Sequence, residues 1–174
     1  MTTSVPTTTP TSLPTTAPTT ASTLAAPADS RALGLAHYAA RGVLEHFLAR
    51  HGATFLQQVT LRAAVTAEAP QTADALVSQV RASLKSDPAD VHAALGELLT
   101  RGLLVADGEH LRPTEAGRAL LAAVAAESAP VSARIWSGIP AEDLAAAGRV
   151  LALVAERANA ELAGLAARTA GPTH

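Results

Sequence analysis

Three histidines on one predicted helix have the clearest potential for chemistry in this sequence. His37, His46 and His51 all lie within residues 30–52, and His37 and His51 extend the apolar stripe of that segment. An imidazole changes its charge near neutral pH, so a histidine beside an arginine could bind a phenolate or a carboxylate, or transfer a proton. The alternative is that each histidine is an ordinary core or surface residue.

Other kinds of reactive site find no support in the sequence. There is no cysteine, which excludes disulfides, thiolate metal sites and cysteine nucleophiles. No two of these three histidines are three or four residues apart and no H-E-x-x-H motif occurs, so no metal site is expected. The G-x-S-x-G, Walker and dinucleotide-binding glycine patterns are also missing. We expect no cofactor, and any catalysis would be acid–base chemistry at His37, His46 or His51.

The hydrophobic pattern predicts a long amphipathic helix near each end of the chain. Apolar residues recur at helical spacing from Ser30 to His51, where Gly52 provides a stop signal, and again from Pro140 to the end of the segment 122–168. Helices with continuous apolar stripes must bury them, so we expect a homodimer joined through these ends. An intramolecular hairpin of the first and last helices is the alternative.

Between these two helices the sequence predicts a compact helical unit with a β-hairpin. Helices are predicted over 54–69, 72–84, 87–101 and 114–129, opened by Thr54, Thr72, Asp87 and Thr114. The buried seam of the third of them is expected to comprise Val91, Leu95, Leu98 and Leu99. Asp107-Gly108 is a tight-turn signal between two short extended segments. The predicted fold class is therefore mainly α with a small β-hairpin.

The composition fits a globular helical protein that carries a polar tail. Hydrophobic residues make up 48% of the chain and aromatic residues only 2%, which favours a helical core of alanine and leucine. Residues 1–29 form a Thr/Pro-rich tract that we expect to be disordered, with a glycosylated stalk as the alternative, and 169–174 form a flexible tail. No apolar run approaches the ~18 residues of a membrane span and no secretory signal is evident, so we expect a cytoplasmic protein.

The order of these elements and three sequence segments resemble the MarR family of winged-helix regulators. The segments are ELLTRGLL (97–104), LRPTEAGRALL (111–121) and IWSGIPAEDLAAAGRVL (135–151), and the resemblance covers roughly Leu33 to Leu165. It implies a winged helix-turn-helix domain at 53–121, flanked by dimerisation helices at 30–52 and 122–168. It also implies homodimers that bind pseudo-palindromic double-stranded DNA and release it when a small aromatic or phenolic ligand binds.

The same resemblance places the helix at 87–101 in the major groove and the hairpin against the minor groove or the DNA backbone. The predicted DNA-binding residues are Arg81, Lys85, Ser86, Asp90, His92, His110 and Arg112. The exposed face of this helix carries Asp90 and Glu97 in place of arginines, and the hairpin is shorter than in most members. Residues 54–121 contain six Lys/Arg against eight Asp/Glu, a balance that offers little neutralisation of phosphates.

This acidic balance leaves a second function open. The alternative is a MarR-like fold that no longer binds DNA and acts as a small-molecule-binding protein or a cofactor-independent enzyme. A protein-interaction scaffold that uses the acidic face is a third possibility. Transcription regulation is the leading hypothesis.

A ligand cleft is implied between the dimerisation and winged-helix regions, bordered by the first, second and fifth helices. Gln58 and Arg62 could supply the few polar groups that such a cleft needs, and Trp136 could form one wall. Together with His37, His46 and His51, these residues are the predicted binding set for a small aromatic or phenolic molecule.

Overall fold

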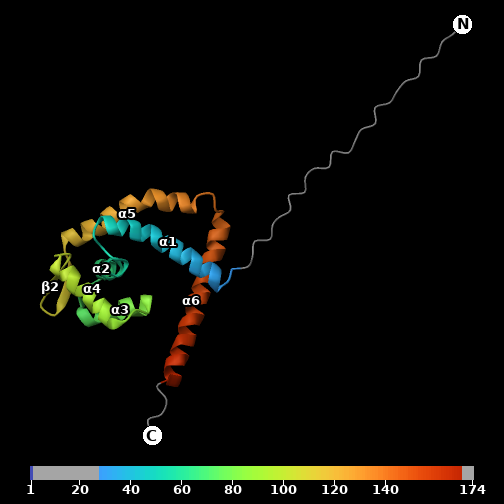
Figure 1. The fold of residues 1–174 in the computed structure, drawn as a ribbon. Helices are drawn as coiled ribbons and strands as arrows, with labels where there is room; N and C mark the ends of the chain where they lie inside the picture. Colours follow the sequence, from blue (N-terminus) through green and yellow to red (C-terminus); the bar gives the residue numbers. More distant parts are fainter. Residues whose placement is uncertain (2–27, 170–174) are drawn as a thin grey trace. The chain divides into compact units, whose positions relative to one another are not determined.

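The computed structural model describes Met1 and residues 28–169, with six helices and three strands in this part of the chain (Figure 1). The predicted tails lie almost entirely outside the described residues. The chain divides into two compact units, residues 1–37 and 38–174. Helix α1 (Ser30–Arg50) begins in the first unit after Asp29, whose carboxylate accepts a hydrogen bond from the Ala32 backbone N–H at 2.8 Å, and its residues from Tyr38 onward belong to the second unit. The predicted start of this helix is confirmed.

Three short helices form the centre of the second unit, and each begins at its predicted cap. They are α2 (Phe55–Thr66), α3 (Ala73–Leu84) and α4 (Pro88–Thr100). At α2 the capping is reciprocal, because the Thr54 hydroxyl accepts from the Gln57 N–H at 3.2 Å and the Gln57 side chain accepts from the Thr54 N–H at 3.0 Å. At α4 the Asp87 carboxylate accepts from the Ala89 N–H at 2.8 Å, and Pro88 takes the first helical position.

The core of this unit lies where α2, α3, α4 and the hairpin meet. Its buried side chains include Leu61, Leu76, Val80, Val91, Leu95, Leu98, Leu104 and Leu111. The prediction for Leu99 was wrong, since this residue is 37% exposed. Ala94 is buried instead, because the face of α4 that packs on α2 and α3 follows the positions 91, 94, 95 and 98.

A three-stranded antiparallel sheet forms the wing. Strands β2 (Leu104–Asp107) and β3 (His110–Pro113) form the predicted hairpin, and β1 (Gln71–Thr72) pairs with the other edge of β3. Asp107 lies opposite His110, so the two loop residues are Gly108 and Glu109, one position later than predicted. Gly108 has a φ of 61°, which glycine adopts without a steric penalty. The two residues of β1 were not predicted, because so short a strand shows no alternation.

Helix α5 (Glu115–Trp136) begins at the predicted cap and is longer than predicted. It continues through Pro130, which lies inside the helix, rather than ending at Ala129. The Thr114 hydroxyl accepts from the Gly117 N–H at 3.0 Å and donates to the Gly102 carbonyl at 2.8 Å. This contact fixes the start of α5 against the turn that ends α4.

Helix α6 (Ala141–Thr169) buries none of its residues. Its exposed apolar side chains are Val150, Leu151, Leu153, Val154, Leu162 and Leu165. The intramolecular hairpin considered as an alternative would have buried this stripe within the chain, and that is not observed. No helix of the described residues is both long enough and apolar enough to cross a membrane.

Candidate nucleic-acid interface and ligand pocket

Helix α4 leaves one face exposed beside the wing. This face is made mostly of small or polar residues, namely Ala89, Asp90, His92, Ala93 and Gly96. A Cβ at Gly96 would meet no atom of the described chain within 4 Å. Glycine in a helix interior costs about 1 kcal/mol relative to alanine, and packing within the described chain gives no reason to keep it here. A face of this kind allows another molecule to approach the helix backbone closely.

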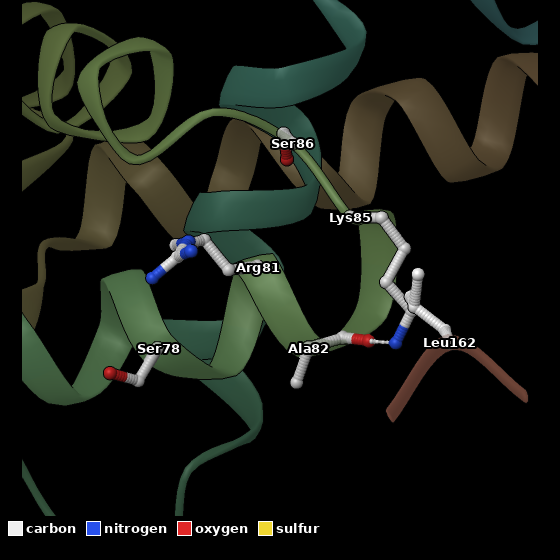
Figure 2. Close-up of a pocket in the computed structure, with 6 residues that line it drawn as sticks. All are labelled: Ser78, Arg81, Ala82, Lys85, Ser86 and Leu162. Carbon is white, nitrogen blue, oxygen red and sulfur yellow. Dashed lines mark hydrogen bonds between the residues drawn. The ribbon is translucent and has the colours of Figure 1, made fainter. Parts of the chain in front are cut away.

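Two cationic side chains lie at the end of α3, just before α4 begins. A cavity of about 510 Å³ is lined there by Ser78, Arg81, Ala82, Lys85, Ser86 and, from α6, Leu162 (Figure 2). Arg81 is exposed, and its guanidinium makes no ion pair or hydrogen bond with any residue that the structure describes. Its charge is therefore available to a bound anion.

Lys85 and Ser86 form the turn between α3 and α4. Lys85 adopts a left-handed conformation with a φ of 56°, and its ammonium group donates to the Ala82 carbonyl at 2.5 Å, the dashed contact in Figure 2. The hydroxyl of Ser86 is buried and has no hydrogen-bond partner among the described residues. Arg81, Lys85 and Ser86 thus line one cavity, which places two cationic side chains where a phosphate could bind.

The wing carries two basic residues, and one of them already pairs with a carboxylate of the protein. His110 and Arg112 are both exposed on β3, and the Arg112 guanidinium lies 3.0 Å from the Asp107 carboxylate. Both partners are more than half exposed, with 57% and 62% of their side chains accessible, so the pair contributes at most about 1 kcal/mol. A phosphate could therefore compete for Arg112, although the nearby Asp107 charge would oppose it.

Two charged side chains near the end of α4 form hydrogen bonds within the protein, and the sequence did not predict these contacts. Glu97 is exposed as expected, and its carboxylate also accepts a hydrogen bond from the Gln57 side chain at the start of α2. Arg101 donates to the backbone carbonyls of His51 at 3.1 Å and Gly52 at 2.8 Å. Both residues lie within the ELLTRGLL segment, which was the only sequence signal that they had a role.

The structure does not bring the predicted ligand-binding set together. His37 and His46 are exposed on α1, and the His46 ring stands edge-on to Phe47 with a centroid distance of 5.4 Å. Gln58 is buried on α2, whereas Arg62 is exposed and lines a small groove shared with α3. Arg62 and Trp136 therefore line two different cavities.

His51 contacts α5 rather than the other predicted ligand residues. Its Nε2 lies 3.0 Å from Oε1 of Glu127, and the Arg50 guanidinium lies 3.5 Å from Oε2 of the same carboxylate. This cluster joins the last turn of α1 to the middle of α5. Its contacts hold α1 and α5 together, which is a structural role. The described residues contain no group of three or more His, Cys, Asp or Glu that could hold a metal ion.

Trp136 lines a small cavity between α1 and α5, which includes no residue of α2 and so differs from the cleft expected from the sequence. The cavity has a volume of about 200 Å³ and is lined by Ala40, Val43, Leu44, Ser128, Ser132, Ile135 and Trp136. Its walls are apolar apart from two serine hydroxyls, which is the character of a site for a small aromatic molecule. Trp136 is 57% exposed and would be covered further by a ligand or a second chain.

Comparison with known proteins finds the same fold in several solved structures. No protein-family model and no curated protein gives a significant match to the chain. A MarR-family transcriptional regulator from Rhodococcus sp. RHA1 is 23% identical with a TM-score of 0.59, over 71% of this chain and 90% of that one. CouR from Rhodococcus jostii RHA1, solved with p-coumaroyl-CoA, is 22% identical with a TM-score of 0.59, over 71% and 88% of the two chains.

A third neighbour agrees more closely in structure and less in sequence. Staphylococcus aureus MarR, in complex with salicylate and kanamycin, has a TM-score of 0.66 at 14% identity, over 75% of this chain and 90% of that one. These matches span nearly the whole length of the neighbours and confirm the resemblance of fold. The chain therefore has the winged-helix fold of the MarR-type transcriptional regulators.

Proposed function

We propose that this protein is a homodimeric, ligand-responsive regulator of transcription that binds double-stranded DNA in the cytoplasm. Helix α4 would enter the major groove, and the wing formed by β2 and β3 would lie along the backbone or the minor groove. The exposed apolar stripe of α6 would be buried against a second copy of the chain. Two copies of α4 would then face two half-sites of a pseudo-palindromic operator.

One observation carries this proposal: the exposed face of α4 begins next to the cavity that Arg81 of α3 lines together with Lys85 and Ser86 of the turn. Phosphate contacts supply most of the non-specific affinity for DNA and fix the register of the helix in the groove. Glu97 is bonded to the neutral Gln57 side chain and Asp107 is paired with Arg112, and both carboxylates keep their charge, so the phosphate contacts are expected from Arg81 and Lys85.

Removal of the two cations at the end of α3 should weaken DNA binding strongly. The double variant Arg81→Ala/Lys85→Ala is expected to lose about tenfold in affinity, or about 1.4 kcal/mol, for each phosphate contact removed. The slope of log K against log salt should become shallower by about 2 for each subunit, because each subunit would neutralise two fewer phosphates. Fluorescence anisotropy, with an operator selected from a random duplex library, measures both quantities at two salt concentrations.

The control for this experiment is Arg62→Ala, which removes one positive charge from an exposed position in the groove between α2 and α3 and is compared with the loss per charge in the double variant. It should change the affinity by less than about threefold, which is the weak effect of a distant screened charge. Equal losses in the control and the double variant would contradict the docking geometry. If no duplex is enriched by the folded wild-type protein at low salt, the proposal fails in favour of a MarR-like protein that acts only on small molecules.

The cavity between α1 and α5 is the proposed site for the effector, a small aromatic or phenolic molecule. Two of the neighbouring structures were solved with small molecules, one with p-coumaroyl-CoA and one with salicylate and kanamycin, so salicylate is a reasonable first probe. Trp136, the only tryptophan, lines the cavity and reports binding directly by its fluorescence. We expect saturable quenching by salicylate, and a loss of at least about tenfold in affinity when Ser132→Leu fills the cavity.

The matched control is Ser83→Leu, an exposed serine on α3 that lies outside this cavity. It should leave the titration unchanged. Quenching that persists with equal affinity in Ser132→Leu would place the aromatic ligand elsewhere.

A further inference from the structure

His51, the residue that follows the last turn of α1, contacts two other helices at once. The ring of His51 contacts Glu127 of α5, with 3.0 Å between Nε2 and Oε1. The carbonyl of the same residue accepts a hydrogen bond at 3.1 Å from Arg101, the residue that caps α4. A shift of α5 against α1 therefore acts on a residue that is also bonded to the end of α4.

Several hydrogen bonds join the end of α4 to the segment between α1 and α2. The Arg101 guanidinium also donates to the Gly52 carbonyl at 2.8 Å and to Oε1 of Gln57 at 3.3 Å. Gln57 is only 5% exposed and donates in turn to the carboxylate of Glu97, one helical turn before Arg101. Hydrogen bonds from a guanidinium have a fixed fork geometry, so this set holds α4 in one orientation relative to the junction of α1 and α2.

The connection on the α5 side leads to the cavity described above. Glu127 binds His51 and Arg50, and the next residue, Ser128, lines the cavity together with Ser132 and Trp136. A molecule that entered this cavity would press on α5 directly beside Glu127. The neighbouring apolar cluster, which includes Leu48 and Val124, packs α1 against α5 and gives this junction a fixed reference position.

We propose that His51 and Arg101 form a joint that transmits a displacement of α5 relative to α1 into a reorientation of α4. Arg101 is in this view a positioning residue: it contacts neither the cavity nor the exposed face of α4. The joint deepens the proposed function, since it specifies how occupancy of the cavity would reach the DNA-binding helix. The coupling itself is a property of the fold, so it can be tested without DNA and without a ligand.

The test compares the full-length wild type with Glu127→Ala, Arg101→Met and the double variant. Hydrogen–deuterium exchange of the α4 amides reports how often this helix opens locally. Glu127→Ala removes a contact on α5, yet it is expected to raise exchange in α4 by about threefold or more, and Arg101→Met to raise it further. In the double variant the effect of Glu127→Ala should vanish, because the path through Arg101 is already broken.

The matched control is Glu45→Ala, which breaks an exposed pair with Arg41 on the same helix α1 and should leave α4 unchanged. Unchanged exchange in Glu127→Ala would overturn the proposal, and so would independent effects that multiply in the double variant. If Arg101→Met does not fold, Arg101→Lys keeps the charge and loses the fork, and the same comparison applies. A protein that shows this coupling but binds no operator would refute the proposed function alone.

Discussion

Replacing Gly117 with alanine should destabilise the folded protein by about 3 kcal/mol and lower Tm by about 10 °C. The N-terminal turn of α5 packs directly on the chain that leaves α4. A Cβ at this position would lie far inside van der Waals distance of the Leu103 carbonyl oxygen and 3.1 Å from Cδ1 of Leu61. The nearest obstacle is backbone, which cannot rotate away as a flexible side chain can. Urea unfolding monitored by circular dichroism measures the change.

The control for this variant is Gly96→Ala, in the interior of α4, where a Cβ would meet nothing within 4 Å. Relief of the conformational entropy of glycine should stabilise the protein here by up to about 1 kcal/mol. The two substitutions are chemically identical, so opposite signs isolate the contact at Gly117. A loss below about 1 kcal/mol for Gly117→Ala would show that α5 can shift away from Leu103 at little cost.

The second large effect is expected on assembly, from a charge placed in the apolar stripe of α6. Leu151 is 48% exposed in the single chain, and the proposed dimer would bury it. Leu151→Asp would put an unpaired carboxylate into that interface, so the dimer should dissociate at least about 100-fold more readily, or by about 2.8 kcal/mol. Sedimentation equilibrium gives the dissociation constant. DNA affinity should fall with it, because each half-site would then be bound separately.

Ala160→Asp provides the matched control. It introduces the same charge on the same helix, nine residues further on and therefore on the opposite side, where the side chain is exposed. The control should remain a dimer. A wild-type protein that sediments as a monomer would contradict the proposed dimer, whereas dissociation of both variants would show that the interface surrounds α6 on all sides.

The capping residues and the apolar periodicity determined most of the fold from sequence alone. Thr54, Thr72, Asp87 and Thr114 begin helices where they were expected, because a side chain that accepts a hydrogen bond from its own neighbouring backbone acts locally. The segment from 111 to 121 combined such a cap with Gly117. The tertiary structure explains why position 117 is a glycine: the Leu103 backbone approaches it too closely for a side chain.

Elements without a local signal were missed. The strand at Gln71–Thr72 exists only because β3 presents a free edge to it, and α5 continues past Ala129 although a proline follows. A strand of two residues has no period, and proline is an unfavourable residue inside a helix. For the strand, the deciding interaction is the pairing with His110 and Leu111, which lie about forty residues further along the chain.

The sequence determined the elements, their order and the acidic balance of the winged-helix domain, because these follow from residue type and local spacing. Only the tertiary structure decided which charged side chains form hydrogen bonds within the protein and which do not. Glu97 and Arg101 hold the junction of α1, α2 and α4, whereas Arg81 remains exposed beside α4. It also separated His51, which contacts α5, from His37 and His46, which are exposed. A charge count cannot contain this information, since the partner of each side chain is set by packing between segments far apart in the chain.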